Sequence, residues 1–168
     1  MGINTFKYLL IFVVSVLLQV LIFNNLLIAK IIAPFFYILF IVLLPFDTPR
    51  SLLLFLSLAL GFTVDIFTNT PGVHASASLL VGFIRPGILG ILTSRETLDS
   101  ITAPRVKNMG FQWFATYVTF IVIIHHLFLF FVEAFTFDDF FITLLRVILS
   151  SILSIILIVL SQFLIFRN

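Results

Sequence analysis

Long apolar stretches without any charged residue dominate this chain of 168 residues. A charged side chain at the centre of a bilayer costs at least about 2.5–3.5 kcal/mol on insertion scales, so charge-free stretches mark membrane-crossing segments. Hydrophobic residues make up 62% of the chain and charged residues 10%, against roughly 45–50% and about 25% in soluble domains. The sequence therefore predicts an integral membrane protein.

Charges and turn residues divide these stretches into six predicted spans. A spanning helix takes about 20 residues, so six spans with short loops use nearly the whole chain. We expect residues 1–168 to form a single polytopic membrane domain, with almost nothing left over for a second, water-soluble catalytic domain. The predicted spans cover about 6–23, 31–46, 51–68, 73–92, 111–132 and 140–166.

The stretches are too continuously apolar for the alternating strands of a membrane β-barrel. Helices are the remaining way to satisfy the backbone in lipid, so the predicted fold class is an all-α bundle of six transmembrane helices. The first stretch is too long for a usual signal peptide, and we expect it to be retained as an anchor.

Basic residues predict the orientation of the bundle. If the N-terminus is cytoplasmic, the outer loops hold only Lys30 among the basic residues, and both termini lie in the cytoplasm. The cytoplasmic side then collects Lys7, Arg50, Arg95, Arg105, Lys107 and Arg167.

Several function classes lack the residues that they require. The chain has no cysteine, which excludes disulfides, thiolate metal sites, thiol catalysis and lipoprotein acylation. An aspartyl intramembrane protease needs two aspartates that share a proton, and only Asp65 lies well inside an apolar stretch. No nucleophile elbow or phosphate-binding loop is present. We therefore expect no enzymatic activity and no cofactor, and the few charges give no indication of nucleic-acid binding.

The adjacent His125 and His126 project about 100° apart on a helix, so they cannot form the i, i+4 pair of a helical zinc site. We expect no metal site. His126 and Glu133 are seven residues apart and share a helical face. They are interpreted as satisfied interior polar groups, with a recognition surface as the alternative. His74 is expected to be interfacial, near the start of its span.

Small residues recur every four positions in the predicted helices 51–68 and 73–92. They predict a tight hairpin in which two backbones approach closely, although a ligand pocket or a partner helix along this stripe is an alternative. The stripes consist of Ser57, Gly61 and Asp65 on one helix and Ser78, Gly82 and Pro86 on the other.

Asp65 is a candidate functional residue, because an acid inside an apolar stretch needs a partner. We expect that partner to be Arg146, which lies at a similar depth in the last span, so that the role is structural pairing or helix-end hydrogen bonding. A contact to a partner protein or ligand is the alternative. Arg85 is expected to extend toward the cytoplasmic surface, or to bind a carbonyl freed by a helix break at Pro86.

The segment from Gly61 to Ala77 resembles the most recognisable segment of the rod shape-determining protein MreD family. In that segment a Gly-x-x-x-Asp helix end runs into a turn, here Pro71-Gly72, and a His-Ala start, here His74-Ala75. The similarity covers essentially the whole chain. It extends to Pro34-Phe-Phe-Tyr-Ile-Leu-Phe, Leu44-Pro45-Phe, Phe83-Ile-Arg85-Pro86 and His125-His126.

The resemblance implies a non-catalytic component of the cell-elongation complex in the bacterial cytoplasmic membrane. It would act with the bitopic partner MreC and indirectly with actin-like MreB and the glycosyltransferase and transpeptidase that build lateral peptidoglycan. It also implies a bundle similar to the substrate-binding subunits (S-components) of energy-coupling-factor vitamin transporters. The matching positions, which carry structural or partner-contact roles and no catalytic one, are Asp65, Pro71, Gly72, His74, Arg85 and Pro86.

Two hypotheses follow. The first is a membrane scaffold that organises lateral peptidoglycan synthesis and so cell shape. The second is the substrate-binding subunit of a small-solute transporter, with Asp65, His126, Glu133 and Arg146 lining a pocket near the outer face.

Overall fold

The computed structural model describes residues 2–26, 31–101, 103–136 and 139–165. Within these ranges the fold is all-helical, and no strand is present. The elements are α1 (Gly2–Leu21), the 3-10 turn η1 (Phe23–Asn25), α2 (Leu39–Leu43), α3 (Arg50–Thr68), α4 (Val73–Leu92), α5 (Arg95–Ser100), α6 (Val106–Met109), α7 (Phe111–Ala134) and α8 (Phe140–Ile165).

Five helical segments in the described ranges are long and apolar enough to cross a membrane, which makes the chain a multi-pass membrane protein. They correspond to the predicted spans 6–23, 51–68, 73–92, 111–132 and 140–166. The bounds of α3 and α4 agree with the prediction to within one residue, because charges and Pro-Gly turns delimit both helices. Residue 166, the predicted end of the last span, lies outside the described residues, as do Lys30 and Arg167.

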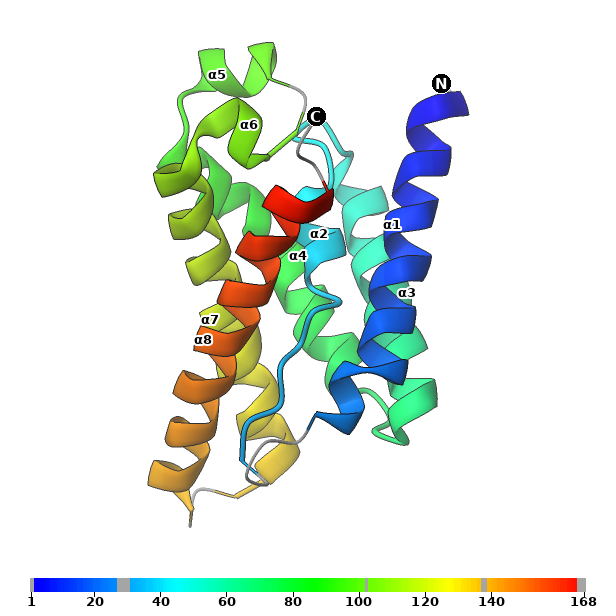
Figure 1. Ribbon diagram of the computed structural model, residues 1–168, viewed down its shortest axis with the longest axis vertical. Coiled ribbons are helices and arrows are strands. Elements are labelled where there is room, and N and C mark those ends of the chain that lie inside the picture. Colours follow the sequence, from blue (N-terminus) through cyan, green and yellow to red (C-terminus); the bar gives the residue numbers. More distant parts are fainter. Residues whose placement is uncertain (1, 27–30, 102, 137–138, 166–168) are drawn as a thin grey trace.

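The predicted helix over 31–46 is wrong. Residues 31–38 are not helical, and the helix that follows, α2, has only five residues. Figure 1 shows this segment rising through the middle of the molecule, between α1 and α8. Pro34 has no N–H to give to a helix, and an apolar run does not by itself distinguish a buried extended segment from a buried helix. Non-helical backbone at membrane depth is tolerated where protein surrounds it, and residues 34–44 are all buried.

Residues 31–46 nevertheless carry the chain from one end of the bundle toward the other, with α2 part-way along this path (Figure 1). As a result α1 begins and α8 ends at the same end of the molecule, where α5 and α6 also lie (Figure 1). The described ends of the chain, Gly2 and Ile165, therefore lie at the same end of the bundle.

Two glycines make the predicted close approach of α3 and α4 possible. A Cβ atom on Gly61 would overlap the backbone of His74 and lie 2.6 Å from the Cα of Ala75. A Cβ on Gly82 would lie 2.8 Å from the Cβ of Ser57. The prediction of a tight hairpin is confirmed.

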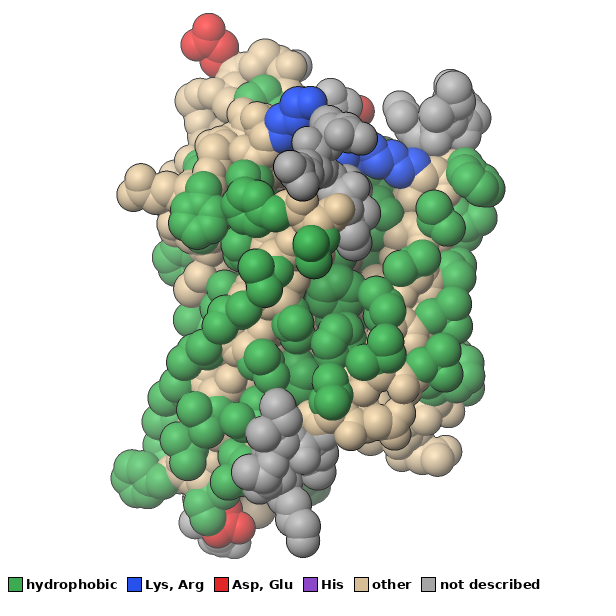
Figure 2. Space-filling model, in the orientation of Figure 1, with side chains coloured by type: hydrophobic (Ala, Val, Ile, Leu, Met, Phe, Trp, Pro, Cys, Tyr) green, Lys and Arg blue, Asp and Glu red, His purple; other side chains and the backbone are tan. Residues whose placement is uncertain are grey.

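The lateral surface of the bundle is mostly apolar. Figure 2 shows hydrophobic side chains covering the length of the molecule, with the basic and acidic side chains near its two ends. Large exposed side chains such as Phe55, Phe62, Phe141 and Leu164 belong to the long helices. This distribution is suited to lipid contact along the sides of the bundle.

Candidate functional site

Gln19 of α1 binds the non-helical segment through three backbone groups. Its Oε1 accepts the N–H of Phe36 at 2.7 Å and the N–H of Tyr37 at 3.3 Å. Its Nε2 donates to the carbonyl oxygen of Pro34 at 3.1 Å. The side chain is fully buried, so a single amide replaces hydrogen bonds that a helix would make within itself.

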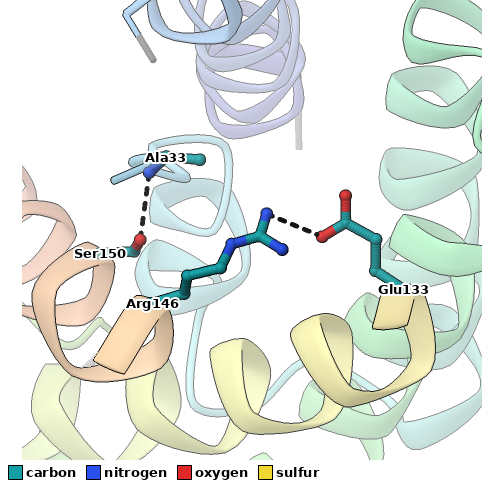
Figure 3. Close-up of polar contacts among 4 residues, drawn as sticks. All are labelled: Ala33, Glu133, Arg146 and Ser150. Carbon is teal, nitrogen blue, oxygen red and sulfur yellow. Dashed lines mark hydrogen bonds and ion pairs between the residues drawn. The ribbon is translucent and has the colours of Figure 1, made fainter. Parts of the chain in front are cut away.

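Two serines of α8 hold the same segment from the opposite side. Ser150 Oγ accepts the N–H of Ala33 at 3.1 Å, as Figure 3 shows, and Ser154 Oγ accepts the N–H of Phe35 at 2.9 Å. The chain crosses the bundle without helical hydrogen bonds because side chains of α1 and α8 supply them.

His126 extends this network into α7. Its Nδ1 lies 2.9 Å from the carbonyl oxygen of Val122, which can only accept, so Nδ1 carries the proton. Its Nε2 then accepts from the Ser154 hydroxyl at 3.1 Å. The expectation of satisfied interior groups is confirmed for His126 and is wrong for Glu133, whose side chain is 41% exposed.

Asp65 caps the first turn of α4. Its Oδ1 accepts from the Thr70 hydroxyl and the N–H of His74, both at 2.9 Å. Its Oδ2 accepts the N–H groups of Gly72 at 3.1 Å and Ala75 at 2.9 Å. The residue before α4, Gly72, has no side chain to cap these otherwise unpaired donors. The expectation of helix-end hydrogen bonding is confirmed.

The expected ion pair between Asp65 and Arg146 is wrong. The four donors of the α3–α4 turn occupy the Asp65 carboxylate, whereas Arg146 Nη2 lies 3.3 Å from Glu133 Oε2. Figure 3 shows the guanidinium reaching from α8 toward Glu133 on α7. The charged group also lies over the ring of Phe130, with its Cζ 4.7 Å from the ring centroid.

The turn residues Pro71 and Gly72 lie where the sequence places them, between α3 and α4. Gly72 has a φ of +87°, a conformation that other residues seldom adopt. Together with the Asp65 cap, this glycine fixes the chain reversal and the start of α4.

Arg85 is buried and does not extend to the surface, contrary to one expectation. Its Nε donates to the Tyr117 hydroxyl at 2.8 Å, and its Nη atoms donate to the carbonyl oxygens of Leu44 and Pro45. It does bind backbone carbonyls, but these belong to the end of α2, because α4 continues through Pro86. The negative end of α2 therefore compensates the buried cation.

A second polar cluster joins α4, α7 and the non-helical segment. The Tyr37 hydroxyl lies 3.0 Å from His74 Nδ1 and 2.6 Å from His125 Nε2. His74 lies near the start of α4, as expected, and its side chain is buried in this cluster. No pattern in the sequence singled out Tyr37 as a polar contact residue, because its partners lie 37 and 88 residues away. Among the described residues, no group of three or more His, Cys, Asp or Glu side chains could hold a metal ion.

A cavity of about 260 Å³ opens at the end of the bundle opposite the termini. The end of α1, the start of the non-helical segment, the α3–α4 turn and the facing parts of α7 and α8 surround it. Glu133 and Arg146 line this cavity as the transport hypothesis expects, whereas Asp65 and His126 are absent from its lining. Its other polar lining residues include Gln19, Asn24, Thr70 and His74.

Comparison with protein-family models, with curated proteins and with solved structures found no match. The family resemblance of the sequence therefore stays a prediction.

Proposed function

We propose that this chain is a non-catalytic membrane scaffold of the bacterial cell-elongation (rod) complex. It docks the bitopic membrane protein MreC and, through it, contributes to organising MreB and the glycosyltransferase and transpeptidase of lateral peptidoglycan synthesis. The support from the sequence is the resemblance of Gly61–Ala77 and its neighbours to the MreD family.

The observation that carries the proposal is that three buried polar side chains, Asp65, Arg85 and Gln19, bind the chain's own backbone. Asp65 binds the α3–α4 turn, Arg85 binds the end of α2, and Gln19 binds residues 34–37. Each of these side chains fixes the path of the chain and is occupied in doing so. Such an interior is suited to a rigid body that presents its outer surface to other proteins.

The orientation belongs to the same proposal. The end of the bundle that holds α5 and α6 carries Arg50, Arg95 and Lys107, so the positive-inside rule favours the cytoplasm for that end and for both termini. The opposite end would then face the periplasm, and the membrane would be the bacterial cytoplasmic membrane. We further propose a bundle similar to energy-coupling-factor S-components, with residues 31–46 as the second of six crossings.

Depletion of the chain in its native cells tests the scaffold proposal. We expect rod-shaped cells to become round, and a plasmid-borne copy to restore the rod. Variants that preserve the fold but change lipid-facing residues, such as Phe55→Leu on α3, serve as controls that should also rescue. Cells that keep their shape and growth rate after complete depletion would contradict the proposal.

A second candidate function is the substrate-binding subunit of a small-solute transporter. The cavity between α7, α8 and the α3–α4 turn favours it, because such subunits bind their solute in a cavity with a few polar groups. A vitamin that raises the unfolding temperature of the purified chain would support transport. The scaffold requires no such ligand.

A further inference from the structure

The cavity that contains Glu133 and Arg146 has a composition that the scaffold proposal does not explain. The two side chains project into it from α7 and α8 and carry opposite charges. Their side chains are 26% exposed for Arg146 and 41% exposed for Glu133, so the pair is open to solvent or to a ligand.

The contact between the two charges is incomplete. A single Nη2–Oε2 distance of 3.3 Å joins them, whereas charge-assisted hydrogen bonds between such groups are normally about 2.7–2.9 Å and often doubled. Arg146 Nε has no hydrogen-bond partner although it is shielded from solvent. Because a single Nη2–Oε2 contact joins the pair among the described residues, the guanidinium keeps donors for an incoming anionic group, and Glu133 keeps acceptor capacity for a cation.

The walls of the cavity position the guanidinium. Phe130 lies beneath it, and the ring of Phe35 lies 5.7 Å from that of Phe130. Asn24 and Thr70 line other parts of the cavity and contribute an amide and a hydroxyl. The site thus combines a cation held on an aromatic face, an adjacent carboxylate and neutral polar groups.

The opposite charges of Glu133 and Arg146 indicate which class of ligand the cavity can bind. A purely anionic ligand at Arg146 would be repelled by Glu133, and a purely cationic ligand at Glu133 would be repelled by Arg146. A zwitterion can place its anionic group on Arg146 and its cationic group on Glu133. The cavity lies at the level where α7 ends and α8 begins, which is where lipid headgroups meet a spanning bundle.

We propose that this cavity binds a phosphoethanolamine group, with the phosphate on Arg146 and the primary ammonium on Glu133. The group can come from a phosphatidylethanolamine lipid or from a soluble molecule such as glycerophosphoethanolamine. A phosphate suits the planar fork of arginine, and a primary ammonium supplies N–H donors that a trimethylammonium lacks.

Thermal unfolding and calorimetry of the purified full chain test the proposal. In detergent, the probes are glycerophosphoethanolamine, glycerophosphocholine and glycerophosphoglycerol. In nanodiscs, the chain is compared in phosphatidylcholine alone and with added phosphatidylethanolamine or phosphatidylglycerol. We expect the ethanolamine form to bind about tenfold more tightly than the other two, the ratio that one charge-assisted hydrogen bond gives.

The two arms distinguish the source of the group. A preference for ethanolamine both in detergent and in nanodiscs indicates that the headgroup alone is sufficient for binding. A preference for ethanolamine only in nanodiscs indicates that the lipid is the ligand. Equal behaviour of all headgroups in both arms would overturn the proposal.

Two variants separate binding from a structural role. Glu133→Gln removes the partner of the ammonium group and should abolish the preference for ethanolamine. The variant should also bind glycerophosphoglycerol more tightly than the unmodified chain does. Arg146→Gln should weaken all three phosphate ligands about tenfold. Arg50→Gln, exposed at the other end of the bundle, is the matched control. If the pair only ties α7 to α8, both cavity variants would lower the unfolding temperature equally in every lipid, without a change in preference.

This proposal does not depend on the scaffold function. A chain that captures its partner but shows no headgroup preference would contradict only the ligand site. Ethanolamine binding without any effect on cell shape would contradict only the scaffold.

Discussion

Arg85 of α4 donates to the carbonyl oxygen of Leu44, so a buried cation closes a helix of only five residues. The same guanidinium binds Tyr117 of α7, whose hydroxyl donates to the carbonyl oxygen of Val42 at 3.3 Å. Arg85 and Tyr117 together fix the end of α2 between α4 and α7. The segment that the sequence predicted as a spanning helix is thus held in a non-helical path by side chains of the surrounding helices.

Replacing Arg85 tests this role. Arg85→Met leaves the carbonyls of Leu44 and Pro45 without a donor, and we expect a loss of about 2–4 kcal/mol in the free energy of unfolding. Arg85→Lys keeps the charge but not the planar fork and should be intermediate. Thermal unfolding in detergent measures both, with Arg50→Met at an exposed helix start as the control. An Arg85→Met protein as stable as the control would contradict the role.

Gln19 should be equally important to the segment. Gln19→Leu keeps the bulk of the side chain but leaves the N–H groups of Phe36 and Tyr37 unpaired, so we expect a loss of about 2–4 kcal/mol. Gln112→Leu, at an exposed position in the first turn of α7, is the matched control and should change stability little. The readout is the fraction of protein that remains monodisperse after heating. Equal survival of the two variants would show that the amide of Gln19 is dispensable.

A double-mutant cycle separates the two possible partners of Arg146. Asp65→Ala removes four hydrogen bonds at the start of α4 and should cost at least about 1–2 kcal/mol, as the loss of a helix cap does. Its effect should add to that of Arg146→Gln within about 0.5 kcal/mol, because the two residues share no contact. The partly exposed Glu133–Arg146 pair should show a coupling of at most about 1 kcal/mol. Strong coupling between Asp65 and Arg146 would indicate an ion pair between them and would contradict the contacts seen in the structure.

The glycines of the α3–α4 hairpin give a prediction in which a second substitution should restore stability. Gly82→Ala places a methyl group against Ser57 and should destabilise the hairpin, and Ser57→Gly should relieve that variant. Gly61→Ala meets the backbone of His74 and Ala75, and Ser57→Gly should not help it. Gly90→Ala, where a methyl group meets nothing, is the control. Similar unfolding temperatures for Gly61→Ala and Gly90→Ala would contradict the close approach of α3 and α4.

The sequence predicted the long helices well, because uninterrupted apolar runs and Pro-Gly turns fix where helices can begin and end in lipid. The structural roles expected of Asp65 also included helix-end hydrogen bonding, beside the pairing with Arg146 that the structure contradicts. Both inferences depend on residues that are near one another in the chain.

The errors concern contacts between distant residues. Residues 31–46 are apolar enough for a helix, and side chains distant in the sequence, such as Gln19 and Ser150, replace the helical hydrogen bonds. Those partners lie 17 and 117 residues away from the groups that they bind. The Arg85–Leu44 contact and the Tyr37 cluster were beyond prediction for the same reason, because one sequence carries no record of which interior faces meet.

Capture of the tagged chain from native membranes tests the scaffold proposal most directly. After mild solubilisation, we expect a single-span protein with a periplasmic coiled coil to co-purify with the intact chain in a fixed ratio. The single-span protein should no longer co-purify with the Gly61→Ala variant, in which the hairpin is disrupted, and should still co-purify with Gly90→Ala. A folded chain that captures no such protein, although that protein is present in the same membranes, would contradict the account.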